Sequence, residues 1–221
     1  MTVRCKVAIE LSVLAVLTVA FLLLFPRRPP AVDMGLGGFA VLCLLLSAGY
    51  TRRVIWSASP SPVPEPRLKR CVQVTLWITV PVMLVFLIIG LFLGYRSGGW
   101  AGAMHRVFNW RMVAAFGFYL VWALVQQTLF QYYLLGRLLA LFPQKHPALP
   151  VAITGVAFAL VHLPDYWTML ATIPAGLVWC SLYYRYRCLL PLAFSHAALG
   201  ATFYYGLFGH DLAAEWSAIL P

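Results

Sequence analysis

The chain has 221 residues, of which 62% are hydrophobic and only 10% are charged. Soluble proteins carry about 25% charged residues, so this composition excludes a soluble globular protein and indicates a membrane protein. Sixteen Lys and Arg residues against six Asp and Glu residues give a formal net charge of +10. In a membrane protein this excess favours basic loops at an anionic lipid surface over a nucleic-acid partner. Because a span needs about 20 apolar residues, the length allows about six to eight spans and no separate soluble domain.

Seven apolar runs, separated by charged or turn residues, predict seven membrane-spanning helices. In chain order they cover residues 7–25, 34–50, 72–95, 113–135, 149–163, 168–184 and 188–208. The first run is longer than the apolar part of a signal peptide and has no small-residue cleavage site, which predicts a retained span. The fifth is short and could be tilted, broken or re-entrant, so an eighth segment stays open. The predicted fold is an all-α polytopic transmembrane helical bundle of about seven spans, seven to eight in all.

A proline-rich basic segment separates the second and third runs. Between residues 57 and 70, a proline stands at every second position from 60 to 66, and three basic residues follow. This pattern predicts an extended loop with polyproline character rather than a helix.

Basic residues are divided unequally between the two sides of the predicted bundle. With seven spans, one side holds eleven, namely Arg4, Lys6, Arg52, Arg53, Arg67, Lys69, Arg70, Arg137, Lys145, Arg185 and Arg187. The other side holds five, namely Arg27, Arg28, Arg96, Arg106 and Arg111. The positive-inside rule therefore predicts a cytoplasmic N-terminus, and we expect the protein in an inner or plasma membrane. The C-terminus is expected on the outside, and an eighth span would reverse its side.

The cysteines and three of the histidines form no recognisable site. No Cys-x-x-Cys pair is present, which favours small apolar fillers over a disulfide framework or a thiolate zinc site. The cysteines are Cys5, Cys43, Cys71, Cys180 and Cys188. We expect His105, His146 and His210 to be solvated, because they fall in predicted loops.

Three amides and two imidazoles lie inside predicted spans, where polar groups need partners. Gln126, Gln127 and Gln131 fall within six residues of the fourth span. The last two are four residues apart and share a helical face, so we expect the group to line an interior cavity. His162 ends the fifth span, and His196 lies in the seventh. Each side chain could instead be a hydrogen-bonding contact between helices, worth roughly 1 kcal/mol.

In order and spacing, these residues resemble the motifs of the CPBP family of intramembrane endopeptidases, which comprises CAAX proteases and bacteriocin-processing, Abi-type enzymes. Family members carry Glu-Glu-x-x-x-Arg on one helix, Phe-x-x-x-His on a second and His-x-x-x-Asn on a third. In this chain residues 126–134 stand at the first motif. Phe158 and His162 match the second, and His196 and Gly200 stand at the third.

The resemblance covers nearly half of the chain and divides it into three parts. The first consists of N-terminal transmembrane helices with the proline-rich basic loop, the second resembles the intramembrane protease core, and the third is a short C-terminal tail. Their boundaries are 1–109, 110–208 and 209–221.

The resemblance implies a buried cavity in which the first Glu activates water for attack on a peptide carbonyl. The histidine of the second motif assists, and the last His and Asn stabilise the oxyanion. The family positions are Gln126, Gln127, His162 and His196, with Gln131, Phe158, Gly200 and Asp165 as substrate-binding or supporting residues. An amide cannot accept the proton that a general base takes up, and loss of a positioned base costs about 10²- to 10⁴-fold in rate. We therefore expect catalysis to be lost or strongly impaired.

The substitutions have a common physical effect, which is to neutralise the site. A Glu-to-Gln change keeps shape and hydrogen bonding but removes a charge that is costly to bury. Gln131 at the Arg position fits, because a buried Arg without acidic partners would be costly. The pattern is that of a protein that binds a membrane-tethered peptide or protein without cleaving it.

No cofactor is predicted, and a divalent metal such as zinc is a disfavoured alternative. Catalytic zinc takes three protein ligands and one open position, whereas only His162 and His196 are available as ligands here. Asp165 could orient His162 or serve as a base, but the favoured interpretation is a loop residue or helix N-cap. None of the six carboxylates lies within the helices that resemble the protease core.

Two alternative functions stay open on the sequence. One is an active endopeptidase with a rearranged site of His162, His196 and Asp165. The other is a non-enzymatic transporter or assembly subunit whose Gln and His side chains line a polar pathway. The expected partners are the lipid bilayer and a membrane-tethered substrate; the sequence sets no oligomeric state.

Overall fold

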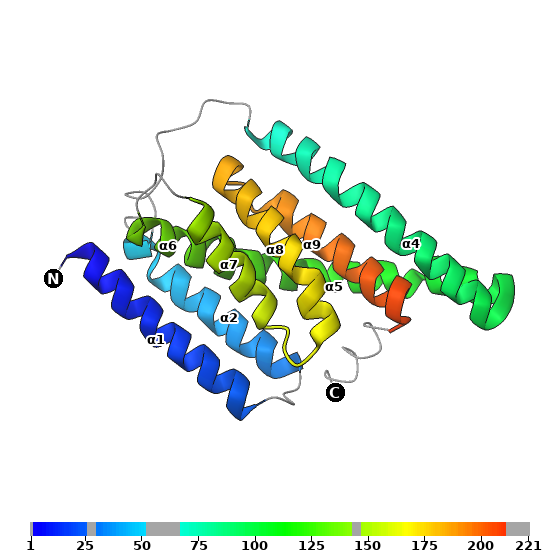
Figure 1. The fold of residues 1–221 in the computed structure, drawn as a ribbon, viewed down its shortest axis with the longest axis horizontal. Coiled ribbons are helices and arrows are strands. Elements are labelled where there is room, and N and C mark those ends of the chain that lie inside the picture. The colour runs from blue at the N-terminus through cyan, green and yellow to red at the C-terminus, as the bar shows by residue number, and fades with distance from the viewer. Residues whose placement is uncertain (1, 26–29, 52–66, 143–146, 211–221) are drawn as a thin grey trace. The chain divides into compact units, whose positions relative to one another are not determined.

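The protein is described from a computed structural model, which places residues 2–25, 30–51, 67–142 and 147–210. Within these ranges the chain forms helices joined by short turns and contains no strand (Figure 1). The predicted all-α fold is confirmed.

The described helices follow the predicted spans closely. They are α1 (Val3–Leu24), α2 (Pro30–Leu46), α4 (Arg67–Val107), α5 (Trp110–Gln127), the π-helix η1 (Thr128–Leu135), α6 (Gly136–Leu141), α7 (Ala148–Leu160), α8 (Tyr166–Tyr186), α9 (Leu190–Thr202) and the π-helix η2 (Phe203–Phe208). The fourth predicted span corresponds to α5, η1 and α6 in succession, and the seventh to α9 followed by η2.

Three of the described helical stretches are long and apolar enough to cross a membrane: Val3–Leu24, Leu68–Val107 and Trp110–Leu141. Two shorter apolar helices cover Val32–Leu46 and Ala148–Leu160. A stretch of about 20 apolar residues is what a bilayer core requires. These helices support an integral membrane protein, while the number of spans stays a prediction.

The basic end of the predicted proline-rich loop is helical. α4 begins at Arg67, so residues 67–70 form its first turn. The expectation of an extended loop is wrong for these residues, because a proline restricts the residue before it and leaves the residue after it free to start a helix. Residues 57–66 of that loop lie outside the described ranges.

The predicted loop after the third span is also largely helical. α4 continues to Val107, with a break at Gly98 and Gly99. Gly99 has φ +61°, a left-handed conformation that a residue without Cβ adopts at little cost. The short helix after the break folds back on the long one, since a Cβ built on Gly94 would lie 2.7 Å from the carbonyl oxygen of Gly102. Two helical pieces therefore form a hairpin here.

By their contacts, the residues form two compact units. Unit 1 consists of Met1–Arg67 and Gln126–Leu189, and unit 2 consists of Leu68–Val125 and Leu190–Pro221. Each unit thus combines residues from the N-terminal part of the chain with residues from the predicted protease-like core.

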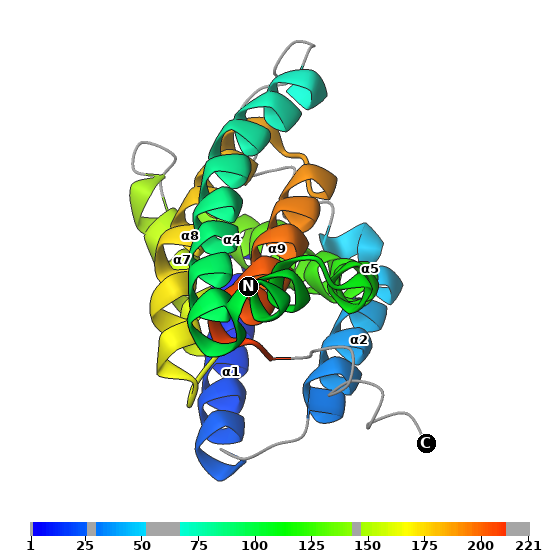
Figure 2. The ribbon, with the colours of Figure 1, turned by 90° about the vertical axis from the view of Figure 1, so that its right-hand side faces the viewer.

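In unit 1, α7 and α8 lie side by side, as both views of the ribbon show (Figures 1 and 2). Two glycines set their distance. A Cβ built on Gly176 would lie 2.8 Å from the Gly155 carbonyl oxygen, and one on Gly155 would lie 2.9 Å from the Leu177 nitrogen. Small residues allow such close backbone approach between membrane helices. η1 contacts both α7 and α8 and also α2, while α1 contacts α6.

In unit 2, α4 packs against η2 and α5 against α9. A Cβ built on Gly90 would lie 2.8 Å from the Gly206 Cα, and the rings of Phe86 and Phe203 are 5.5 Å apart. The buried cluster between α5 and α9 consists of Tyr119, Ala123, Ala193 and Ala197.

Candidate functional site

The three amides of the first motif lie where the fourth span changes from α- to π-helix. α5 ends at Gln127, and η1 begins at the next residue. π-turns close i→i+5 hydrogen bonds and are frequent at functional sites. Gln126, Gln127 and Gln131 are all buried. The amides therefore face the interior of the protein.

Two of these amide oxygens are buried acceptors whose hydrogen-bonding capacity is not used within the described residues. Among the described residues, the Oε1 atoms of Gln126 and Gln131 are buried and have no hydrogen-bond partner. The Nε2 of Gln131 donates to the Cys180 Sγ on α8 at 3.6 Å. A buried polar atom left without a partner costs about 1–3 kcal/mol, so each oxygen would gain from an N–H or O–H donor.

The second motif packs directly against the first. Phe158, on α7, is fully buried. Its ring lies 5.1 Å from that of Phe130 on η1 and 5.6 Å from that of Trp179 on α8. Phe130 is four residues after Gln126, and Phe158 is four residues before His162. Unit 1 therefore brings the first and second motifs together.

His162 follows the end of α7 and is held by the turn that it belongs to. Its Nδ1 lies 3.0 Å from the Phe158 carbonyl oxygen. A carbonyl only accepts, so Nδ1 carries a proton, and in the neutral ring Nε2 is left as an acceptor. The carboxylates of Asp165 and Asp33 are close enough for their charges to act on this imidazole. Asp33, in the first turn of α2, had no role in the sequence-based prediction.

Asp165 is the N-cap of α8. Its Oδ1 accepts from the Thr168 backbone nitrogen at 3.1 Å, and its Oδ2 accepts from the Thr168 hydroxyl. The N-cap interpretation is confirmed. The backbone N–H of Asp165 donates to the His162 carbonyl oxygen at 2.9 Å, so the two residues belong to one turn. The Asp165 carboxylate, by contrast, accepts hydrogen bonds from the first turn of α8.

The third motif lies on α9, in unit 2. His196 is buried, and its Nε2 lies 3.4 Å from the Tyr119 hydroxyl on α5. The two rings meet edge to face with centroids 5.4 Å apart. The neighbouring Ser195 hydroxyl is 2.7 Å from the Thr79 hydroxyl on α4. Two hydrogen bonds thus fix this part of α9 against α4 and α5.

Tyr119 also fills the space next to Gly200, the position at which the family has Asn. A Cβ built on Gly200 would lie 3.0 Å from the Cδ1 and Cζ of the Tyr119 ring and closer still to its Cε1. An Asn side chain has no room here unless the tyrosine moves. Nothing in the sequence marked Tyr119, because its neighbour is 81 positions along the chain.

The available donors do not fit a resident metal ion. Within the described ranges, no group of three or more His, Cys, Asp or Glu side chains could hold one. The carboxylate positions of the first motif are amides, which leaves His162 and His196 as the ligands that the motif positions offer. A catalytic zinc site needs three protein ligands, which this donor set does not supply.

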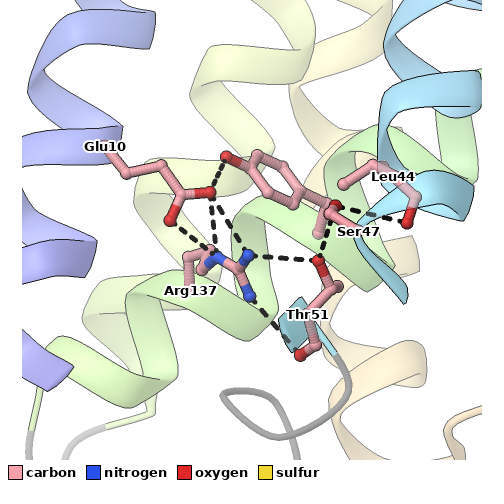
Figure 3. Close-up of polar contacts among 6 residues, drawn as sticks. Glu10, Leu44, Ser47, Thr51 and Arg137 are labelled. Carbon is pink, nitrogen blue, oxygen red and sulfur yellow. Dashed lines mark hydrogen bonds and ion pairs between the residues drawn. The ribbon is translucent and has the colours of Figure 1, made fainter. Parts of the chain in front are cut away.

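A second buried polar cluster ties α1 to the helix that carries the amides (Figure 3). Arg137, on α6, is only 1% exposed, and its Nε lies 3.2 Å from the Oε2 of Glu10 on α1. The Tyr133 hydroxyl donates to the Glu10 Oε1 at 2.5 Å. Arg137 also donates to the hydroxyl and the carbonyl oxygen of Thr51, at 3.2 and 3.5 Å. The prediction that placed Arg137 in a basic loop is therefore wrong.

One comparison with known proteins gives a match. Residues 108–202 match the family model described as Rce1-like, Type II CAAX prenyl endopeptidase Rce1-like. No curated protein and no solved structure matches the chain. The matched residues include all three motif positions. From residue 108 to residue 202 the chain therefore carries a type II CAAX prenyl endopeptidase Rce1-like region, which confirms the resemblance to the CPBP family and identifies an integral membrane, CAAX protease-like protein.

Proposed function

We propose that this protein binds a membrane-tethered peptide or protein and has lost most or all of the ability to cleave it. The observation that carries the proposal is the set of buried amides at the family's Glu positions. Gln126 and Gln127 lie in the protein interior, beside the second motif, but neither can take up a proton at neutral pH. The Glu positions of the family are therefore still buried, but they carry no group that can act as a general base.

The amide oxygens suit a peptide as ligand. An extended peptide offers backbone N–H donors, and the Oε1 atoms of Gln126 and Gln131 are buried acceptors without a partner among the described residues. A hydrogen bond contributes about 0.5–1.5 kcal/mol, and an acceptor otherwise left unsatisfied adds to that gain. These acceptors therefore favour binding of a peptide, while the lack of a base at the same positions accounts for the absence of hydrolysis.

The third motif supports loss of catalysis independently. The family's Asn would help to stabilise an oxyanion, but the Tyr119 ring occupies the room beside Gly200. The hydroxyl of the same tyrosine contacts Nε2 of His196. Within unit 2 alone, the family's Asn is thus replaced by Gly200, and His196 is in contact with the tyrosine.

The membrane orientation belongs to the same proposal. Removing the buried Arg137 from the count of loop residues leaves ten basic residues on the predicted cytoplasmic side against five outside. The positive-inside rule still favours a cytoplasmic N-terminus, and an inner or plasma membrane is the proposed location.

The binding arm of the test uses full-length protein in proteoliposomes and a fluorescent peptide with a lipid anchor. Gln126→Leu should weaken binding about fivefold, the factor that corresponds to one hydrogen bond of about 1 kcal/mol. Gln73→Leu is the matched control, because Gln73 is an exposed amide on α4. Equal effects of the two substitutions would contradict peptide binding at the first motif.

The hydrolysis arm uses the same peptide and the unaltered protein. We expect no cleavage above the rate of a His162→Ala variant. Robust cleavage that His162→Ala abolishes would overturn the proposal in favour of the rearranged endopeptidase. That alternative, with a site of His162, His196 and Asp165, is supported by the acceptor Nε2 of His162 and by Asp165 in the same turn, so it predicts that Asp165→Asn also abolishes turnover.

A further inference from the structure

A cavity of about 580 Å³ opens within unit 2, at the helical hairpin that ends α4. Its polar lining comes from Ser97, His105, Arg106, Asn109 and Tyr205. A second cavity of about 360 Å³ shares His105 and Asn109 with the first and also borders Arg111. None of the family motif positions lines either cavity.

Arg106 is held against the wall of the larger cavity. Its Nη2 donates to the Leu207 carbonyl oxygen at 3.4 Å. Gly209, with φ +66°, leaves room for the guanidinium, since a Cβ built there would lie 2.6 Å from that same Nη2. A guanidinium has five N–H donors, so one bond to a carbonyl leaves donors for a ligand. The side chain is thereby positioned before any ligand arrives.

The surroundings select an anion. The residues that line the two cavities include two arginines, Arg106 and Arg111, and no carboxylate. Asn109 and Ser97 add neutral groups able to donate hydrogen bonds. Arginine binds phosphate through charge-assisted hydrogen bonds, often two at once. A phosphate group therefore matches both the charge and the donors of this cavity.

Exposed aromatic residues around the hairpin are of the kind that proteins place at the level of lipid headgroups. Trp100, Phe108 and Trp110 are 71, 73 and 75% exposed and lie on either side of His105 and Arg106 in the sequence. Tryptophan is enriched at membrane–water interfaces, where its ring meets the apolar region and its N–H meets water. A phospholipid has an anionic headgroup above apolar chains. The basic cavity could hold the headgroup, and the exposed aromatic side chains could contact the apolar chains.

We infer that this cavity binds the phosphate headgroup of an anionic phospholipid, with Arg106 as the anchoring side chain and the exposed aromatic residues in the interfacial layer. His105 is exposed, as expected of a solvated residue, but it lies on the helix of the hairpin rather than in a loop, and it lines the cavity. The proposal concerns unit 2 alone and is independent of whether the protein binds or cleaves a peptide.

The test titrates phosphatidylglycerol against full-length protein in phosphatidylcholine nanodiscs and measures bound phosphatidylglycerol by native mass spectrometry. Arg106→Gln should weaken binding about fivefold, the factor equivalent to about 1 kcal/mol for one basic side chain at an anionic surface. Arg96→Gln is the matched control, because Arg96 is exposed, stacks on Phe92 and does not line the cavity. It should change binding less than twofold.

Two further variants keep the test informative if Arg106→Gln unfolds. Arg106→Lys retains the charge and should retain most of the binding, and His105→Glu adds a carboxylate at an exposed position and should reduce binding as Arg106→Gln does. Equal losses from the Arg96 and Arg106 variants, or equal retention of phosphatidylglycerol and phosphatidylcholine, would overturn the proposal. Competition by inorganic phosphate at the concentration of the lipid would assign the cavity to a soluble anion and overturn the lipid assignment.

Discussion

The guanidinium of Arg137 and the carboxylate of Glu10 pair at 3.2 Å across 127 positions of the chain. The pair links the N-terminal helix α1 to the continuous helical stretch that carries Gln126, Gln127 and Gln131. The rings of Tyr50 and Tyr133 lie 5.2 and 4.9 Å from the guanidinium carbon and shield it further. An N-terminal helix outside the family-matched region thereby helps to position the first motif.

The first prediction concerns this ion pair. Glu10→Leu should destabilise the protein by about 3–5 kcal/mol, because it leaves Arg137 buried without its carboxylate partner. Denaturant unfolding in detergent measures the change. The double variant Glu10→Leu with Arg137→Met should recover much of the loss, since it removes both buried charges. Arg185→Met, at an exposed position on α8, is the control and should have little effect. A Glu10→Leu variant as stable as the control would show that α1 is not held by this contact.

The second prediction concerns Tyr119 and Gly200. Gly200→Ala should destabilise the protein by about 1–3 kcal/mol, because the added methyl group meets the Tyr119 ring. Gly117→Ala is the control: Gly117 lies on α5 with open space around it, so the alanine should be neutral or stabilising by about 0.5–1 kcal/mol. Combining Gly200→Ala with Tyr119→Ala should make the Gly200 substitution nearly neutral. If Gly200→Ala and Gly117→Ala behave alike, Tyr119 does not fill this space.

The third prediction separates the two roles considered for Asp165. As an N-cap, it should tolerate Asp165→Asn, because an amide oxygen also accepts from the Thr168 N–H, whereas Asp165→Ala should cost about 0.5–2 kcal/mol. Thermal unfolding of the three proteins gives the comparison. Peptide binding should be the same for the parent and the Asn variant. A specific loss of peptide hydrolysis in the Asn variant, with stability intact, would assign the carboxylate to catalysis instead.

The fourth prediction concerns restoring the family's carboxylates. Gln126→Glu with Gln127→Glu should not by itself produce peptide hydrolysis, because the Asn position is Gly200 and its space is filled by Tyr119. The pair should also lower stability at neutral pH, since both positions are buried and a buried charge without a partner is costly. Turnover is measured with the lipid-anchored peptide. Efficient cleavage by this double variant would mean that the third motif is already competent.

The sequence by itself determined the membrane class, the helices and the resemblance to the family. Apolar runs and charge positions are local properties of the chain, so the seven predicted spans coincide with described helices and differ mainly at their ends. Motif spacing is equally local, and the match over residues 108–202 agrees with the segment that the motifs indicated. The replacement of Glu by Gln126 and Gln127 needed only the residue identities, because the ability of a side chain to take up a proton is set by its chemistry.

The tertiary structure alone decided which distant residues meet. The pairing of Glu10 with Arg137 and the contact between Tyr119 and Gly200 join positions 127 and 81 residues apart. Neither leaves a periodic pattern in the sequence. The hairpin after α4 likewise depends on a backbone break at Gly98 and Gly99 and on close packing of Gly94 with Gly102. Hydropathy reports where a helix enters lipid, whereas contacts between helices depend on the shape and charge of side chains that only folding brings together.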